Sequence, residues 1–397
     1  MENISDRVNS LSPSATIAMN QKSRDLTAKG INVINLSVGE PDFFTPDHIK
    51  AAAKKAIDDN FSFYPPVAGY PDLKKAIADK FKRENNLEYT TEQVLVSCGA
   101  KHSLANAMMS VVNKGDEVII PAPYWVSYLE QVKLCEGIPV VVNAGIGSNF
   151  KMTPAQLEAA ITPATKVLLL CSPSNPTGAV YSKAELRALA DVLAKHSRIL
   201  ILSDEIYEHI NFIGGHETIA QFADMKDRTI VINGVSKAYA MTGWRIGYMG
   251  APLWLIKACD KLQGQTTTGA TTIAQKAAVA ALTGDQTCVT DMNLAFRRRK
   301  ELVVKLVREI PNLNVYDPDG AFYVFPQVDA YYGKSINGTL IANSTDLCLY
   351  LLDQAHIATV PGDAFGDDTC IRISFATSDE KLVEAMKRMK DALAALK

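Results

Sequence analysis

A lysine that follows a predicted buried strand is the residue in this chain best suited to covalent chemistry. Lys237 lies in a small-residue segment directly after the apolar run 229–232, and Arg245 follows eight positions later. An amine at the end of a buried strand, beside a guanidinium, suggests a Schiff-base lysine next to a site for an anion. Most lysines are simply solvated, so this pair needs support from other parts of the chain.

Two further polar clusters follow apolar runs in the same way. Asn175 begins an Asn-Pro-Thr-Gly segment after the run 167–170, and Asp204 begins an Asp-Glu-Ile-Tyr segment after the run 199–202. Parallel strands of an open α/β sheet bind ligands at their carboxyl ends, so the three clusters predict one site. Asp204 viewed alone also suits a helix N-cap after a strand.

Two other positions offer groups that bind anions. A turn of small residues connects the predicted strand 93–96 to a predicted helix, and it consists of Gly99, Ala100 and Lys101. The free N–H groups of such a helix start suit a phosphate. Lys101 offers its charge either to that phosphate or to a distal substrate carboxylate. Arg372 alternates with apolar neighbours on a predicted strand, which indicates either a buried ion pair or a fork for a carboxylate.

These positions require a large α/β fold. Short apolar runs alternate with helical segments from about residue 93 to residue 250, which is typical of a mainly parallel sheet wound by helices. Later strands interleaved with helices suggest a second, smaller α/β domain completed by the N-terminal segment. We expect a large domain over 45–290 and a small domain built from 1–44 and 291–397. No predicted strand is followed by GxGxxG, so a dinucleotide fold has no support.

Composition narrows the class of protein. The 397 residues include 41 basic and 43 acidic side chains, and a net charge of −2 points neither to nucleic acid nor to an anionic membrane. Seven cysteines, none in a CxxC pair, read as free buried thiols in a reducing cytosol. Neither a signal peptide nor an apolar run of roughly 18 residues is visible, so we expect a cytoplasmic protein without membrane spans.

Five motifs in this order resemble the fold-type I pyridoxal-phosphate aminotransferases, and most closely the bacterial aspartate aminotransferases of class I. They are Ser-Val-Gly-Glu-Pro-Asp-Phe at 37–43, Pro-Tyr-Trp-Val-Ser-Tyr at 123–128, Asn-Pro-Thr-Gly at 175–178, Asp-Glu-Ile-Tyr at 204–207 and Ser-Lys-x-x-x-x-Thr-Gly-Trp-Arg-Ile-Gly at 236–247. The resemblance extends from about residue 13 to the last helix. It implies pyridoxal 5′-phosphate as cofactor, an amino acid and a 2-oxo acid as substrates, and a homodimer with shared active sites.

The resemblance also implies roles for individual residues. Lys237 would hold the cofactor covalently and carry the substrate proton, and Asp204 would keep the pyridine nitrogen protonated. The other cofactor contacts are Tyr207 and Asn175 at the ring 3′-oxygen, Trp125 stacked on the ring, and Arg245, Ser236 and the 99–101 turn at the phosphate. Tyr64 would reach the phosphate of the neighbouring subunit. The substrate α-carboxylate would meet Arg372 and the N–H of Gly39, and Trp125 and Asn175 would contact the substrate as well as the cofactor.

The N-terminal segment supplies two more candidates. Ser14 is the expected cap of a helix ending near Gly30, and this segment covers the site in the family when substrate binds. Ser14 and Thr16 are therefore candidate substrate contacts. In related enzymes that also accept prephenate a lysine often precedes Pro-Ser-Ala-Thr, whereas this chain has Ser12 there, a departure that weakens a prephenate role without removing it.

The predicted activity is transfer of the amino group of L-aspartate to 2-oxoglutarate, giving oxaloacetate and L-glutamate. Both substrates are dicarboxylic, so a second cation besides Arg372 is needed, and Lys101 is the candidate. Aminotransferases of aromatic, alanine or prephenate specificity, and other reactions on the same cofactor, are alternatives. A cofactor-binding regulator of this fold would need a basic DNA-binding segment that we do not expect here. A serine hydrolase at Ser236 lacks the second glycine of GxSxG.

Overall fold

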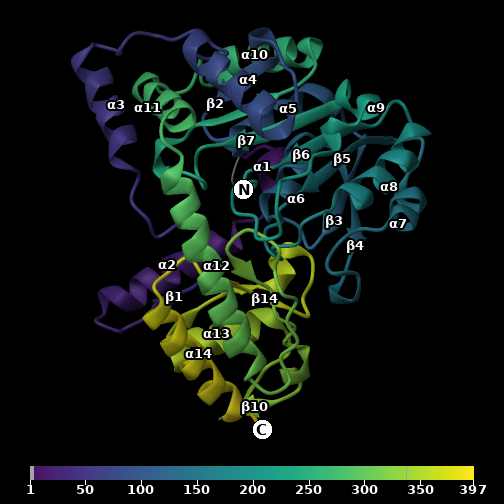
Figure 1. Cartoon of the computed structure of the whole chain (residues 1–397). Helices are drawn as coiled ribbons and strands as arrows, with labels where there is room; N and C mark the ends of the chain where they lie inside the picture. The colour runs from purple at the N-terminus through teal and green to yellow at the C-terminus, as the bar shows by residue number, and fades with distance from the viewer. Residues whose placement is uncertain (1–3, 337) are drawn as a thin grey trace.

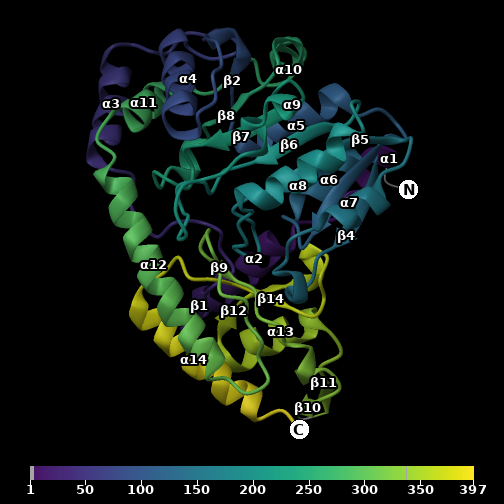
Figure 2. The same cartoon turned by 45° about the vertical axis from the view of Figure 1, so that its right-hand side comes forward.

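The computed structural model describes residues 4–336 and 338–397, which form two layered parts (Figures 1 and 2). One part is built on a seven-stranded sheet and the other on a three-stranded sheet. The long helix α12 (Thr287–Arg308) runs from the first part into the second. Within the described residues, no helix is long and apolar enough to cross a membrane.

The seven-stranded sheet is mainly parallel, in agreement with the predicted fold class. Its order is β2-β8-β7-β6-β5-β3-β4, and β8 runs antiparallel to both of its neighbours. The strands are β2 (Val94–Ser97), β3 (Glu117–Ala122), β4 (Ile138–Asn143), β5 (Thr165–Cys171), β6 (Leu200–Asp204), β7 (Thr229–Gly234) and β8 (Gly247–Gly250). The sequence did not predict β8, because four residues bounded by glycines carry a weak strand signal.

Helices bury both faces of this sheet. Val118 and Leu169 pack with one set of helices, whereas Ile119 and Leu168 pack with the other. Neighbouring side chains of a strand point to opposite faces, so strands buried on both sides read as continuous apolar runs. The first face carries α5 (Ala100–Val111), α6 (Ser127–Leu134) and α10 (Leu253–Thr266). The second carries α3 (Asp47–Asp58), α4 (Pro71–Asn85), α7 (Pro154–Ala160), α8 (Lys183–Ala194) and α11 (Thr272–Thr283).

The second part joins the two ends of the chain. Ile34 of the N-terminal strand β1 pairs in parallel with Ile357 of β12. The three-stranded sheet has the order β13-β14-β9. Its elements are β1 (Ile34–Asn35), β9 (Tyr323–Val324), β12 (Ile357–Ala358), β13 (Val360–Pro361), β14 (Ile371–Ser374), α2 (Ala15–Ala28), α13 (Ser344–Ala355) and α14 (Asp379–Ala394). We propose that the domain boundaries lie at 45 and 290 as predicted; residues 1–3 of the small domain are outside the described residues.

Shorter elements complete the chain. They are α1 (Asp6–Asn9), α9 (Ala223–Lys226), β10 (Ser335–Ile336), β11 (Thr339–Leu340) and the 3-10 turns η1 (Thr91–Gln93), η2 (Ile146–Ser148), η3 (Ile219–Gln221), η4 (Thr242–Trp244), η5 (Asp329–Tyr331) and η6 (Gly362–Phe365). All seven cysteines are free, as predicted, but only Cys259, Cys348 and Cys370 are buried and the other four are half-buried.

The starts of two helices are capped differently. Ser14 occupies the N-cap position of α2, as expected, although its side chain makes no capping hydrogen bond. The Thr45-Pro46 pair suggests an N-cap followed by a proline at the first helical position of α3, but Pro46 itself occupies the cap position. The Thr45 hydroxyl donates to the Ala240 carbonyl at 2.7 Å and accepts from the Trp244 indole at 3.0 Å. These contacts tie the start of α3 to the segment that carries Lys237.

Candidate active site

The predicted site residues meet at one cavity of about 260 Å³, where the carboxyl ends of β5, β6 and β7 face β14. The predicted residues that line it are Gly39, Ala100, Lys101, Trp125, Asn175, Asp204, Tyr207, Ser236, Lys237, Arg245 and Arg372, together with Ser14 and Thr16. Gly99 lies directly behind Arg245. Tyr64 lies outside the cavity, with 91% of its surface exposed.

Lys237 projects into the cavity from the segment that follows β7. Its Nζ donates a hydrogen bond of 2.6 Å to the Gly39 carbonyl, so this glycine contributes its oxygen here, whereas its N–H was the predicted ligand contact. Burial, reinforced by the positive charges of Arg372 and Arg245, lowers the pKa of Lys237 from 10.5 to about 8. A substantial neutral fraction close to neutral pH is what a nucleophilic or proton-transferring amine requires.

Asp204 ends β6 and is almost fully buried. Its Oδ2 accepts a hydrogen bond of 2.6 Å from the Tyr128 hydroxyl, and its Oδ1 accepts one of 3.2 Å from the Ile206 N–H. Burial raises the pKa of Asp204 from 3.8 to about 6, although the bond from Tyr128 stabilises the carboxylate. The chain continues into a short turn instead of a helix, so the helix-cap alternative does not hold. A buried carboxylate at the cavity suits a protonated nitrogen of a ligand.

Tyr207 and Asn175 present hydrogen-bonding groups beside this carboxylate. The Tyr207 and Tyr323 hydroxyls are 2.7 Å apart. Burial raises the pKa of Tyr207 well above 10, so its phenol stays protonated and available as a donor. Asn175 accepts a hydrogen bond of 3.0 Å from Arg372 through its Oδ1, which directs its amide nitrogen to act as the donor toward a ligand.

Arg372 is buried on β14 among aromatic rings and neutral hydrogen-bond partners. Its guanidinium lies 4.6 Å from the Tyr323 ring centroid and 5.0 Å from that of Phe365, and it donates at 2.5 Å to the Ser37 carbonyl. Within the described residues, no acidic side chain forms a salt bridge with it, and its Nε has no hydrogen-bond partner. A buried cation with an unused donor requires an anion from outside the chain. The alternative of a structural ion pair is therefore wrong.

The start of α5 and Arg245 form a second anion site. Gly99 has a φ of +87°, and a Cβ there would clash with the Arg245 guanidinium. The first N–H groups of α5, from Ala100 onward, have no acceptor within the helix and carry the positive end of its dipole. Ser236 lines the same cavity. This combination of helix N-terminus, hydroxyl and guanidinium suits a phosphate.

Lys101 and Trp125 share another wall. The Lys101 ammonium lies 4.7 Å from the centroid of the Trp125 ring. Desolvation and the charge of Arg245 lower the pKa of Lys101. The indole also packs edge-on against Tyr128, with centroids 5.4 Å apart. The wall therefore combines a flat apolar surface with a cation.

Two tyrosines of the site were missed by sequence reasoning. Tyr128 holds Asp204, and Tyr323 contacts both Tyr207 and Arg372. Tyr128 lies three residues after Trp125, and this i, i+3 spacing could have indicated a shared face. Tyr323 stands in an aromatic strand segment where alternation does not reveal which face meets the cavity.

The fold and this arrangement define a class of enzymes. The chain matches the family model of class I and II aminotransferases over residues 31–389 and belongs to that family. Its members depend on pyridoxal phosphate and use amino acids and 2-oxo acids as substrates. The motif resemblance found in the sequence is thereby confirmed.

Individual relatives narrow the comparison. The chain is 50% identical to the probable aspartate/prephenate aminotransferase of Rickettsia bellii, with 100% of both chains covered. Among solved structures, the aspartate aminotransferase of Rhizobium meliloti has a TM-score of 0.96, 45% identity and full coverage of both chains. The aspartate aminotransferase of Thermus thermophilus, solved with maleate, has a TM-score of 0.93 and 39% identity, covering 99% of this chain and 100% of its own.

The residues at the cavity fit the cofactor. Lys237 offers an amine of lowered pKa for its aldehyde, and Asp204 offers a buried carboxylate for its ring nitrogen. The helix start at Ala100 and the Arg245 guanidinium offer donors for its phosphate. Trp125 lines the cavity with a flat face suited to an aromatic ring. The aldehyde, ring nitrogen, ring face and phosphate of pyridoxal phosphate thus each have a counterpart at this site.

Proposed function

We propose that this aminotransferase moves the amino group of L-aspartate to 2-oxoglutarate, giving oxaloacetate and L-glutamate. The observation that carries the proposal is the presence of two cations, Arg372 and Lys101, in one cavity, neither of them paired with a carboxylate in the described residues. Both proposed substrates are dicarboxylates. The maleate in the Thermus thermophilus structure is also a dicarboxylate, which supports this choice.

In this proposal each residue has a defined task. Arg372 binds the α-carboxylate and Lys101 the distal one. Asp204 would hold a proton on the ring nitrogen of the cofactor, while Tyr207 and Asn175 would donate to its 3′-oxygen. Arg245, Ser236 and the N-terminus of α5 (Gly99, Ala100, Lys101) would bind the phosphate, with Trp125 against the ring. Gly39 borders the substrate, and Ser14 and Thr16 line the cavity next to it.

Proton transfer falls to Lys237. When bound, the cofactor would supply an aldehyde group for the substrate amine and a ring able to spread the negative charge that develops at Cα. The Lys237 amine, with its pKa lowered to about 8 by burial, would take the proton from the substrate Cα and deliver it to the cofactor carbon that bears the aldehyde.

The same proposal includes a cytoplasmic homodimer. Phe44, Phe63 and Tyr64 are exposed to 91%, 79% and 91%. Large aromatic side chains in such positions favour a protein–protein contact. Tyr64 would then reach the cofactor phosphate of the neighbouring subunit.

Prephenate is a second candidate acceptor, because the Rickettsia bellii relative is named for it. Prephenate also carries two carboxylates, so the same pair of cations suits it. Ser12, which stands in place of the lysine expected for prephenate users, donates its N–H to Glu130 Oε2 at 2.8 Å. Serine is neutral, so this position supplies no positive charge for a second carboxylate.

A donor and acceptor panel tests the proposal. With 2-oxoglutarate as acceptor, we expect kcat/KM for aspartate to exceed that for alanine or phenylalanine. In Lys101→Gln we expect kcat/KM for aspartate to fall about tenfold or more while that for alanine changes little, because only the distal carboxylate loses its partner. An equal loss for both donors would show that Lys101 serves the phosphate instead. An assay with prephenate as acceptor and glutamate as donor tests whether prephenate is also a substrate.

A further inference from the structure

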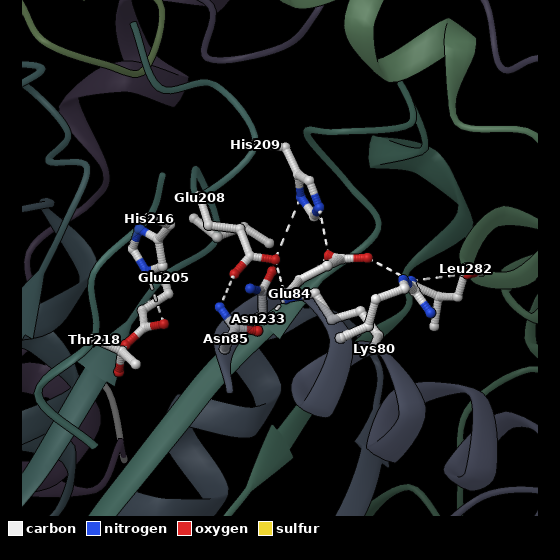
Figure 3. A network of polar contacts seen from close by, with 12 residues as sticks. Lys80, Glu84, Asn85, Glu205, Glu208, His209, His216, Thr218, Asn233 and Leu282 are labelled. Atoms are coloured by element: carbon white, nitrogen blue, oxygen red, sulfur yellow. Dashed lines mark hydrogen bonds and ion pairs between the residues drawn. The ribbon is translucent and has the colours of Figure 1, made fainter. Parts of the chain in front are cut away.

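The turn that carries Asp204 and Tyr207 is held from behind by a buried network of charged side chains. After β6 the Glu208 N–H donates to the Glu205 carbonyl at 3.0 Å, which closes the turn. Asp204 and Tyr207 line the cavity. Glu205 follows Asp204 and is 1% exposed, and Glu208 follows Tyr207 and is 6% exposed. Both glutamates belong to the buried network (Figure 3). The turn therefore has a ligand-facing side and an anchored side.

The C-terminal end of α4 anchors Glu208. The Glu208 carboxylate forms an ion pair with the fully buried Lys80 and accepts a hydrogen bond of 2.9 Å from Asn85. The imidazole of His209 lies between two carboxylates, with Nδ1 3.4 Å from Glu208 and Nε2 2.9 Å from Glu84. Although burial opposes ionisation, Lys80 and nearby histidines lower the pKa of Glu208 to about 2. Glu208 is thus a charged anchor.

The segment before η3 anchors Glu205. The Glu205 carboxylate accepts hydrogen bonds of 2.7 Å from Ser203 and 2.5 Å from Thr218. It also pairs with His216 Nε2 at 2.8 Å. Burial alone would lower the pKa of His216, but the charge of Glu205 raises it. The turn is therefore bound at two positions: helix α4 contacts Glu208, and the 216–218 segment contacts Glu205.

A metal ion is not needed to explain this cluster. Glu208 belongs to two groups of three possible ligands whose atoms lie within 4.8 Å of one another. The Lys80 ammonium already contacts Glu208 and supplies the compensating positive charge. Buried ion pairs add little net stability, because desolvation offsets their attraction. Their strongest effect is to disfavour other arrangements, in which a buried charge would lose its partner.

We propose that Glu208 and Glu205 are positioning residues, which fix the turn so that Asp204 and Tyr207 keep their places in the cavity. The inference rests on the proposed roles of Asp204 and Tyr207 toward the cofactor. Displacement of the turn by a fraction of an ångström would weaken both contacts at once.

Two matched variants test the positioning role. Glu208→Gln and Glu84→Gln each replace a network carboxylate by an amide of the same shape, but Glu208 lies on the turn and Glu84 on α4. The readouts are the dissociation constant for pyridoxal phosphate, titrated into apoprotein, and the pH midpoint of the bound cofactor's absorbance. We expect Glu208→Gln to weaken binding about tenfold or more and to shift the midpoint, and Glu84→Gln to stay within about twofold of wild type.

A milder variant guards against misfolding. Thr218→Val keeps the side-chain shape and removes one donor to Glu205, so we expect cofactor binding about two- to fivefold weaker in a folded protein. If Glu208→Gln and Thr218→Val both bind and titrate as wild type, or if Glu84→Gln alters binding equally, the network serves stability alone and the proposal is overturned. Should Glu208→Gln not fold, Thr218→Val against Glu84→Gln decides.

Asp204→Asn separates this proposal from the proposed function. A wild-type absorbance titration in Asp204→Asn would overturn the role of Asp204 itself. An altered titration in Asp204→Asn, with unaltered titrations in Glu208→Gln and Thr218→Val, would overturn only the positioning role.

Discussion

The two walls of the cavity are built on different principles. On the wall formed by the large sheet, Lys237 and Asp204 already have partners within the chain, the Gly39 carbonyl and the Tyr128 hydroxyl. On the β14 wall, Arg372 has neutral partners only, and its buried Nε has none in the described residues. The large-sheet wall therefore carries groups that can transfer protons, whereas the β14 wall carries a cation that can bind an anionic ligand.

The two walls also differ in how readily their charged groups gain or lose a proton. Burial lowers the pKa of Lys237 to about 8 and raises that of Asp204 to about 6, so both groups titrate closer to neutrality than usual. A guanidinium stays charged throughout this range. The large-sheet wall can therefore change its protonation state during a reaction, whereas the β14 wall supplies a constant charge that orients the substrate.

Removing the lysine should have the largest effect. In Lys237→Ala we expect kcat to fall by about 10⁵-fold or more, since the proposed mechanism assigns both the covalent link and the proton transfer to the Lys237 amine. We also expect the cofactor absorbance to wash out during gel filtration, because the covalent link is lost. Retention of a coloured, active protein would show that the proton-moving wall lies elsewhere.

Removing the guanidinium should have the next largest effect and should spare cofactor binding. In Arg372→Ala we expect kcat/KM to fall roughly a hundredfold or more for aspartate and alanine alike, because every amino acid has an α-carboxylate. Arg372→Lys is the matched control: it keeps the charge but loses the planar fork, so we expect an intermediate loss. Unchanged kinetics in both variants would contradict the division between the walls.

The smallest expected effect concerns stability. The folded pKa of Lys237, about 8, lies below its ordinary 10.5, so folded apoprotein binds fewer protons than unfolded chain between these values and its stability rises with pH there. Below pH 8 Lys237 is charged in both the folded and the unfolded state, so the full cost of burying its charge lowers the free energy of unfolding. In denaturant melts of apoprotein we expect Lys237→Met to be more stable than wild type by about 1–3 kcal/mol at pH 7. The difference in unfolding free energy between Lys237→Met and wild type should become smaller by pH 9.5. Lys390 is exposed, so the corresponding difference for Lys390→Met should not change with pH.

Much of the large-sheet wall could be predicted from local patterns. Asn175, Asp204 and Lys237 each follow an apolar run, and such runs become neighbouring parallel strands whose ends converge. Tyr128 and Tyr323 could not be assigned in this way, since an aromatic residue among apolar ones looks like core. The anchoring role of Glu205 and Glu208 was equally hidden, because their partners lie on α4 and in the 216–218 segment.

By itself the amino-acid sequence determined the types of chemistry available: an amine, a carboxylate and guanidinium groups at the ends of buried strands, in an order typical of one enzyme family. Only the tertiary structure decided which of these groups are paired and which await a ligand. Arg372 meets the Ser37 carbonyl across 335 positions, and Lys237 meets the Gly39 carbonyl across 198. Burial and pairing set the pKa values and the unused donors, and both depend on contacts between segments too distant in the chain for any local pattern to reveal.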